Sequence, residues 1–241
     1  LQRIVAGHLE RAIGAAEQPN IRVVREARAA KADGLYVFNR APLEPGMFMK
    51  LPIGSITPRA WLRRQLELEA DGMLGHLPEI SPFLKWEGNG WVDPQGRSGW
   101  EELPYWLKGY GDLGYVLKDE KVIAQARKWI EAILRSQQSD GWFGPAGLRT
   151  AFKGKPDMWP HMPVLNALQS YHEFSGDRRV LDFMLKYARW QNGLTPDCFG
   201  AGYWPRMRFG DNLESVYWLY NRTGEPWLLD LARKIHQNMA D

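Results

Sequence analysis

Three short turns of one form recur along the chain, and they constrain its fold more than any other feature. They read LKDEKVI from Leu117, SGDRRVL from Ser175 and TGEPWLL from Thr223. In each, an acidic residue follows a short break and apolar residues follow the acid, as at the start of a helix with a buried stripe. The segment before each turn is rich in aromatic residues, and the segment after it is amphipathic. The pattern therefore predicts three helical hairpins.

The spacing of the hairpins favours one all-α architecture. The acids of the three turns are separated by unequal intervals, which a solenoid of fixed period would not show. Two long loops, QQSDGWFGPAGLRTAFKGKPDMWPH and QNGLTPDCFGAGYWPRMRFGD, separate the hairpins. We predict an (α/α)6 toroid, in which inner helices surround a cavity and outer helices surround the inner ones. A full toroid needs about twelve helices and the chain has room for about seven, so we expect an incomplete toroid.

The part of the chain before the hairpins contains an N-terminal segment, an extended lead-in and one helix. We predict that residues 1–38 form an N-terminal arm or helix and that residues 39–241 form the N-terminal portion of the toroid domain. An extended lead-in with four prolines, GLYVFNRAPLEPGMFMKLPIGSITPRAW, should pack across the body. Ser55 or Thr57 is expected to cap the helix that follows, with Pro58 in its first turn. Gly72 and Gly75 are expected to close that helix.

The composition excludes several classes of protein. The 31 basic and 28 acidic residues are interspersed, so no nucleic-acid partner is expected. No apolar run reaches about 18 residues, so no membrane span is expected. The single cysteine, Cys198, excludes an internal disulfide and a Cys-rich zinc site. No signal peptide is visible, although an extracellular or periplasmic location is favoured; the oligomeric state is left open.

An aromatic and acidic group is the first candidate site. Trp100, Glu101, Glu102, Tyr105 and Trp106 lie within seven residues of one another. Sugar sites combine such groups, because aromatic rings stack on the apolar face of a sugar while carboxylates bind its hydroxyls. The alternative is that the two glutamates occupy the first turn of a helix, where its dipole favours them, and that Trp100 anchors a core.

The loop after the first hairpin supplies three further candidates for substrate binding, Trp142, Trp159 and His161. His161 follows Trp159 and Pro160 at the expected start of an inner helix, so it should point into the cavity, where it could bind a hydroxyl or transfer a proton. Trp142 follows an Asp-Gly turn and could serve as a sugar platform if it is exposed at the cavity mouth. The alternative for His161 is a capping or structural role.

Asp211 and Glu214 form the last candidate group. They are three residues apart near the expected start of the next inner helix, so both could face the cavity. An Asp-x-x-Glu capping box explains the same spacing and is the favoured reading. Asp211, Glu214 and Glu101 are the candidate catalytic residues. Motifs for nucleotide binding, serine hydrolases and zinc proteases are absent from the sequence.

Several stretches together resemble one known family. They are NRAPLEPGMFMKLPIGSITPRAWLRRQLELEADGMLGHL, WEELPYWLKGYGDLGYVL, the Gln-Gln-x-Asp-Gly-Trp turn and WPHMPVLNALQSYHEFSGDRRVLDF. In order and spacing they resemble the N-terminal part of the catalytic domain of the β-L-arabinofuranosidase superfamily, glycoside hydrolase family 127 and its relatives, long catalogued as a domain of unknown function. The resemblance covers about four fifths of the chain.

The resemblance implies an α/α-toroid glycoside hydrolase that removes sugars in exo fashion from plant or microbial glycans. His161 matches a histidine that contacts the sugar, and Asp211 stands where a second such histidine would fall. The family's glutamate acid/base and zinc-bound cysteine nucleophile lie beyond the matched segment. The resemblance therefore assigns no metal site here, implies zinc only in the complete protein, and leads us to expect this chain alone to be inactive.

Two other readings stay open at this stage. One is a different α/α-toroid carbohydrate enzyme, an unsaturated glucuronyl hydrolase or polysaccharide lyase, which would use Asp211 and His161 without zinc. The other is a non-catalytic helical module that binds glycans through its aromatic face. A carboxylate pair about 5 to 10 Å apart in the cavity would favour an enzyme.

Overall fold

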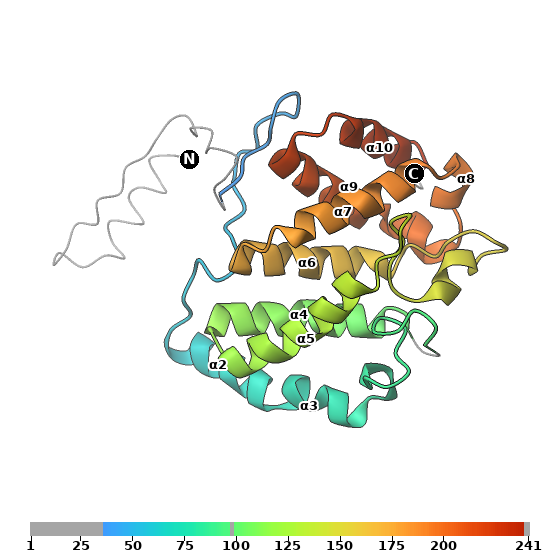
Figure 1. Ribbon diagram of the computed structural model, residues 1–241. Coiled ribbons are helices and arrows are strands. Elements are labelled where there is room, and N and C mark those ends of the chain that lie inside the picture. The colour runs from blue at the N-terminus through green and yellow to red at the C-terminus, as the bar shows by residue number, and fades with distance from the viewer. Residues whose placement is uncertain (1–35, 97–98, 239–241) are drawn as a thin grey trace.

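The computed structural model describes residues 36–96 and 99–238, and within these ranges the chain is helical and has no strand. Three hairpins dominate the structure, as the repeated turns predict (Figure 1). They pair α4 (Glu102–Leu117) with α5 (Glu120–Arg135), α6 (His161–Ser175) with α7 (Arg179–Asn192), and α9 (Tyr203–Thr223) with α10 (Trp227–His236). The shorter elements are α2 (Ala60–Asp71), α3 (Met73–Ile80), α8 (Pro196–Phe199) and two 3-10 turns, Pro82–Leu84 and Ala146–Thr150. The all-α, toroid-like fold class is confirmed.

Each hairpin turns through a residue in the left-handed region. Lys118, Gly176 and Gly224 have φ of 58°, 73° and 74°, and each follows the last residue of an inner helix. This conformation lets the backbone N–H of the turn residue donate to a carbonyl four residues earlier, which ends the helix. Asp119 then caps α5 by accepting the N–H groups of two residues in its first turn. In the third turn Glu225 accepts the Trp227 indole N–H at 2.8 Å instead of capping α10.

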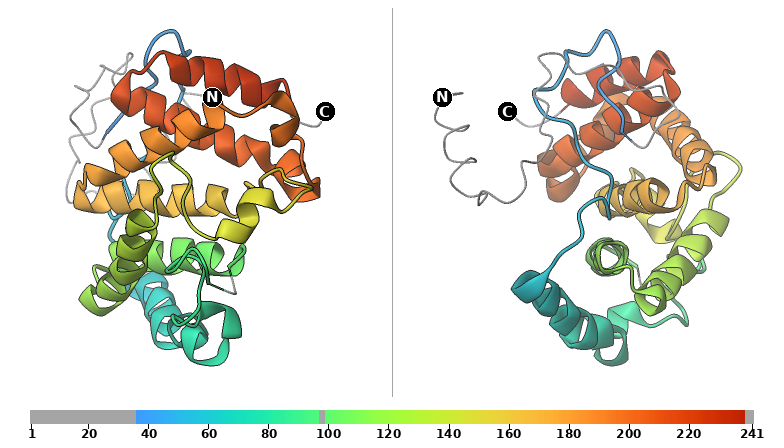
Figure 2. Two further views of the ribbon diagram at one scale, coloured as in Figure 1. Left: turned by 45° about the vertical axis from the view of Figure 1, so that its right-hand side comes forward. Right: turned by 90° about the vertical axis from the view of Figure 1, so that its left-hand side faces the viewer.

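The hairpins stack so that their helices form two layers. The aromatic-rich helices α4, α6 and α9 pack side by side as the inner layer, and α5, α7 and α10 cover them. Figure 2 shows the layers in its right-hand view, where α5 and α7 stand to one side of α4 and α6. On α5 the buried residues recur every three or four positions, at Val122, Ala126, Trp129 and Ile133, so one face of this outer helix closes the core.

The N-terminal lead-in packs across the body, as predicted. Its backbone N–H at Arg40 donates to the Asn221 side chain at 2.9 Å, and the Tyr220 hydroxyl donates to the Ala41 carbonyl. These bonds attach the lead-in to the C-terminal end of α9, and the segment then runs down to α2 (Figure 1).

The start of α2 differs from the prediction. The N-cap is Arg59, which is extended at φ −133° and ψ 164°, and no side chain caps the helix. The capping assignment to Ser55 or Thr57 is therefore wrong, because a turn at Ser55 and an extended segment through Arg59 separate both residues from the start of α2 at Ala60. Gly72 does end α2, whereas Gly75 lies inside α3, so its expected role as a helix end is also wrong.

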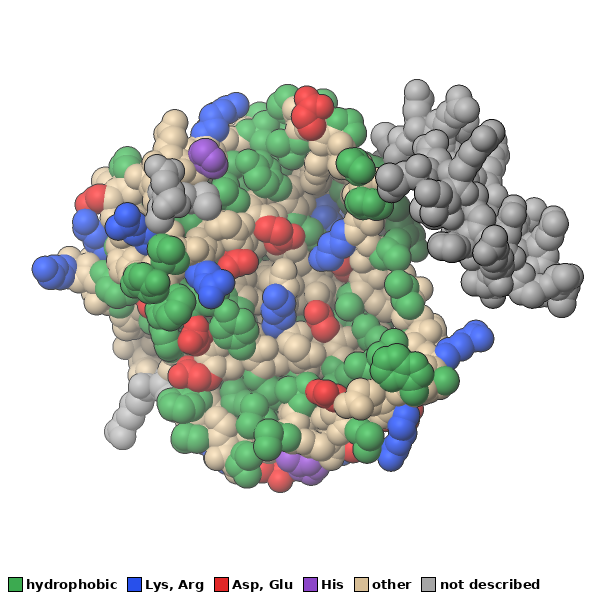
Figure 3. All heavy atoms as spheres, turned by 180° about the vertical axis from the view of Figure 1, so that it is seen from behind, with side chains coloured by type: hydrophobic (Ala, Val, Ile, Leu, Met, Phe, Trp, Pro, Cys, Tyr) green, Lys and Arg blue, Asp and Glu red, His purple; other side chains and the backbone are tan. Residues whose placement is uncertain are grey.

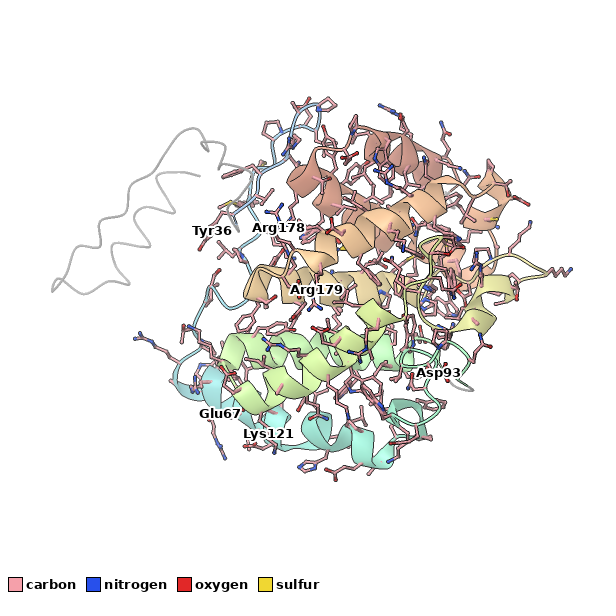
Figure 4. The ribbon with its side chains drawn as sticks, in the orientation of Figure 1. Tyr36, Glu67, Asp93, Lys121, Arg178 and Arg179 are labelled. Carbon is pink, nitrogen blue, oxygen red and sulfur yellow. The ribbon has the colours of Figure 1, made fainter. Side chains whose placement is uncertain are left out.

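The outer layer is joined by an ion-pair network at its surface. Arg179 at the start of α7, labelled in Figure 4, donates to both oxygens of Glu131 on α5, with an Nη1 to Oε2 distance of 3.1 Å. The same guanidinium binds Asp177 at 2.6 Å. Hydrogen bonding from Arg179 lowers the pKa of both carboxyl groups.

Two sequence-based expectations concern the limits of the domain. Residues 1–35 of the predicted arm lie outside the described residues, so the boundary between residues 38 and 39 stays a prediction.

Within the described part of the chain, no helix combines the length and the apolar character that a membrane span requires.

Candidate functional site

A half-open groove of about 90 Å³ lies on the exposed side of the inner layer, between α4, α6 and α9. Its lining combines aromatic, apolar and charged side chains: Tyr105, Lys108, Trp159, Met162, Pro163, Asn166, Asp211 and Glu214. Figure 3 views the molecule from behind, and acidic and basic side chains gather near the middle of this face, with hydrophobic side chains around them. Four of the sequence-predicted site residues therefore meet in one place: Tyr105, Trp159, Asp211 and Glu214.

Helix α9 brings both acids to the groove from its interior. The helix begins at Tyr203, eight residues before Asp211, because Pro205 is tolerated in a first turn where its missing N–H is not needed. Asp211 and Glu214 therefore lie one turn apart on an established helix, and both are exposed. The favoured capping-box reading is wrong, as is the assignment of Asp211 to the N-cap or first turn.

A buried amide holds one of these carboxylates. Gln169 of α6 is fully buried, and its side-chain nitrogen donates to Glu214 Oε2 at 3.0 Å and to Ser215 Oγ at 3.0 Å. A hydrogen bond from a fixed donor restricts the rotamers that a glutamate can adopt. Glu214 is thus oriented from beneath the groove while its exposed portion stays available to a ligand.

An aromatic wall forms the other side of the groove. The rings of Tyr105 and Trp159 are 5.8 Å apart and tilted by 59°. Trp159 is fixed twice, because its indole N–H donates to the Glu101 carboxylate and its backbone N–H donates to Asp157 Oδ1 at 3.1 Å. Asp157 also accepts the indole N–H of Trp100 at 3.0 Å. Tyr105 remains 47% exposed, so its ring is the accessible part of the wall.

Acidic and basic side chains both lie near the aromatic wall and influence its polar groups. Burial and then the charges of Glu101 and Asp211 raise the pKa of the Tyr105 hydroxyl, while Arg208 opposes them. Arg208 lies with its guanidinium carbon 5.7 Å from the centre of the Trp159 ring. Burial, with a smaller contribution from Glu101, raises the pKa of Asp157. The groove can therefore both donate and accept hydrogen bonds along an aromatic surface.

The structure places three other predicted residues in the core. His161 begins α6 as expected, but its side chain is 0% exposed and is enclosed by Trp142, Phe143 and Tyr187. The expectation that it points into an open cavity is therefore wrong, because neighbouring aromatic rings fill the space beside it. Its assignment as a sugar ligand stays a prediction.

The histidine ring is held in one protonation state. Its Nε2 lies 2.9 Å from the Phe143 carbonyl, so this nitrogen carries the proton and donates. Burial lowers the pKa of His161 to about 4, and the ring is neutral near pH 7.

Two tryptophans predicted for the site are also buried. Trp142 is fully buried, so it is not exposed at a cavity mouth and offers no platform. Trp106 stacks on Tyr110 at 4.6 Å, and its indole N–H donates to the Leu74 carbonyl of α3 at 3.0 Å. Glu102 is the first residue of α4 and is half-buried, outside the groove lining.

The sequence analysis missed Lys108, Asn166 and Arg208. Lys108 lies one turn after Tyr105, and Arg208 one turn before Asp211, so helical spacing from residues already named would have found both. Asn166 stands five residues after His161, and no signal in the sequence points to it.

Metal-binding residues do not come together in the described part of the chain. Among residues 36–96 and 99–238, no group of three or more His, Cys, Asp and Glu side chains is arranged to hold a metal ion. Cys198 is buried, with its sulfur 3.5 Å from the Thr195 hydroxyl. The residues present thus do not fit the zinc centre that the resemblance implies for the complete protein.

Stacked helical hairpins, with inner helices that present a groove of aromatic and charged side chains, define a structural class, the α/α-toroid proteins. The model of the family described as β-L-arabinofuranosidase, GH127 catalytic domain, matches residues 62–240, and the chain belongs to this family. It is accordingly a glycoside hydrolase domain of the β-L-arabinofuranosidase type, with a carbohydrate as substrate. A comparison with curated proteins gives no match.

Proposed function

We propose that the groove between α4, α6 and α9 holds the terminal sugar of a β-L-arabinofuranoside, and that the chain takes part in exo-acting removal of this sugar. One observation carries the proposal: successive inner helices bring an exposed aromatic ring, a lysine, an amide and two carboxylates to one groove. This is the combination that a sugar ring requires, because it has an apolar face and hydroxyls around its edge.

Each side of the groove has a distinct role in this proposal. The apolar face of the sugar stacks on Tyr105. Asp211 and Glu214 accept hydrogen bonds from sugar hydroxyls, and Lys108 and Asn166 donate to them. Glu101 acts on Trp159 through the indole hydrogen bond, so it is a positioning residue.

The participation of zinc stays a prediction from the family resemblance. Because the described donor atoms form no zinc site, no step of the proposal passes through a metal. Inactivity of this chain alone also stays a prediction, and the binding assay below does not depend on it.

Binding of a monosaccharide glycoside tests the groove directly. We expect methyl β-L-arabinofuranoside to bind in a calorimetric titration, and Asp211→Asn or Glu214→Gln to weaken it about tenfold, which corresponds to about 1.4 kcal/mol. Asp230→Asn is the matched control, because Asp230 is an exposed acid on α10 that pairs with Arg233 and lies outside the groove lining. Unchanged affinity in both groove variants, or no binding by the unmodified chain, contradicts the proposal.

A second candidate function is supported by the carboxylate pair itself. Asp211 and Glu214 face one groove a single turn apart, as acid and base would in a toroid hydrolase or lyase that needs no metal. A panel of p-nitrophenyl glycosides, assayed with and without a zinc chelator, separates the two. Hydrolysis lost on chelation supports the zinc-dependent β-L-arabinofuranosidase reaction. Hydrolysis that resists chelation but is lost in Asp211→Asn favours the carboxylate mechanism. Binding without hydrolysis agrees with the predicted inactivity of this chain alone and counts against the carboxylate mechanism.

A further inference from the structure

An exposed aromatic cluster lies beside the groove and is not explained by a site for one sugar. We call it the aromatic shelf; it consists of Tyr203, Trp204, Met207 and Arg208 in the first two turns of α9. Tyr203 is 66% exposed and Trp204 is 43% exposed, and their rings meet edge to face at 5.1 Å. Isolated exposed apolar residues are ordinary, but a cluster bordering a pocket marks an interaction site.

The shelf and the groove are continuous along one face of α9. Trp204, Arg208, Asp211 and Glu214 follow one another at intervals of three or four residues, which places them along one side of the helix. Arg208 joins the two parts physically, because its guanidinium carbon lies 5.7 Å from the ring centre of Trp204 and 5.7 Å from that of Trp159. A ligand that leaves the groove in this direction meets the shelf next.

The backbone beneath the shelf is firmly positioned. Gly202, at φ 78°, immediately precedes α9, and a Cβ there would come within 2.3 Å of the Phe152 ring. Only glycine therefore allows the chain to pass Phe152 and enter the helix in this direction. On the buried side of the same helix, Phe209 packs on Phe199 of α8 at 5.8 Å, and both rings are fully buried. The exposed rings are thus presented by a fixed support.

We infer that the aromatic shelf binds the sugar units linked to the one held in the groove, so that the domain recognises an oligosaccharide rather than a single terminal sugar. Aromatic rings stack on the C–H faces of sugars, and a guanidinium held between two rings is oriented to donate to sugar hydroxyls. A glycan chain fits better than a protein partner, because the shelf is a short row of rings that leads into the polar groove. The inference rests on the proposed function.

The test compares ligands that differ only in length. Calorimetric titrations of the unmodified chain use methyl β-L-arabinofuranoside and the corresponding di- and trisaccharides of L-arabinofuranose. A nitrophenyl glycoside is avoided, because its ring could stack on the shelf in place of a sugar. We expect the disaccharide to bind at least tenfold more tightly than the methyl glycoside.

Variants assign the length effect to the shelf. Trp204→Ala should lower affinity for the disaccharide about tenfold and leave that for the methyl glycoside unchanged, whereas Trp204→Phe should retain most of it. Tyr203→Ala is a second variant that does not depend on Trp204. Trp61→Ala is the matched control, because Trp61 is a 78% exposed tryptophan on α2.

The outcomes distinguish this inference from the proposed function. Equal affinity for all three lengths, or an equal loss for methyl glycoside and disaccharide in both shelf variants, overturns the shelf and leaves the groove proposal standing. Failure of the unmodified chain to bind any of the three ligands overturns both.

Discussion

Two aromatic regions lie on either side of α6, and they differ in what surrounds their rings. In the first region, the rings of Trp142, Phe143 and Tyr187 enclose His161. Burial keeps this histidine neutral near pH 7. Around the groove, the rings meet lysine, arginine and carboxylates, and Tyr105 is open to solvent. Aromatic content alone therefore does not indicate a binding site. What distinguishes the site is the polar group within reach of an exposed ring.

The largest expected difference between the two regions is in stability. Trp142→Ala should lower the free energy of unfolding by about 3–5 kcal/mol, because it leaves a cavity among closely packed rings. Tyr105→Ala should lower it by less than about 1 kcal/mol, since that side chain is half exposed, yet should weaken sugar binding. Urea unfolding of both variants, followed by circular dichroism, measures the difference. Equal losses of stability would remove the distinction between core and groove.

The neutral histidine should make stability depend on pH. The folded pKa of His161 is about 4 and its ordinary value is 6.5. Above pH 6.5 the folded and unfolded chains both hold it neutral. As pH falls from 6.5 towards 4, the unfolded chain takes up a proton that the folded chain does not, so this group lowers the free energy of unfolding by about 3 kcal/mol in all.

A variant isolates this contribution. His161→Gln can still donate to the Phe143 carbonyl but does not titrate, so its unfolding free energy should fall less over the same pH interval. Part of the slope should remain, because burial also lowers the pKa of His172. Identical slopes for the variant and the unmodified chain, in urea titrations at several pH values, would contradict the buried, neutral state of His161.

The smallest expected effect concerns Gln169, which links the core to the groove. Gln169→Leu should cost about 1–2 kcal/mol of stability, because it removes the donor to Ser215 and Glu214. It should also weaken sugar binding severalfold, because Glu214 is no longer oriented. Gln191→Leu is a matched control: Gln191 is another buried glutamine, paired with Asn212 at 3.3 Å and 3.2 Å. If Gln169 orients Glu214, both variants should lose stability, but only Gln169→Leu should bind the sugar more weakly in calorimetry. Equal sugar affinities for the two variants would exclude this role of Gln169.

The sequence predicted those features of the fold that depend on local chemistry. The hairpin turns at Lys118, Gly176 and Gly224 could be recognised because left-handed helix ends and the acids that follow them leave a short, contiguous pattern. The start of α9 could not, since Pro205 and Gly210 are both compatible with a helix start and only one of them lies near it. That choice decided whether Asp211 was a cap or a groove residue.

The sequence by itself determined the all-α class and the order of the hairpins, because helix periodicity and turn residues are local properties. It also carried the family resemblance, through the order and spacing of several motifs. Only the tertiary structure decided which aromatic residues are accessible. Trp142 lies two residues after Asp140 and Tyr105 three residues after Glu102, yet Trp142 is fully buried and Tyr105 is half exposed. Burial depends on which helices cover a side chain, and those helices come from distant parts of the chain. For the same reason, Lys108 of α4, Asn166 of α6 and Glu214 of α9 form one groove only after the inner helices pack together.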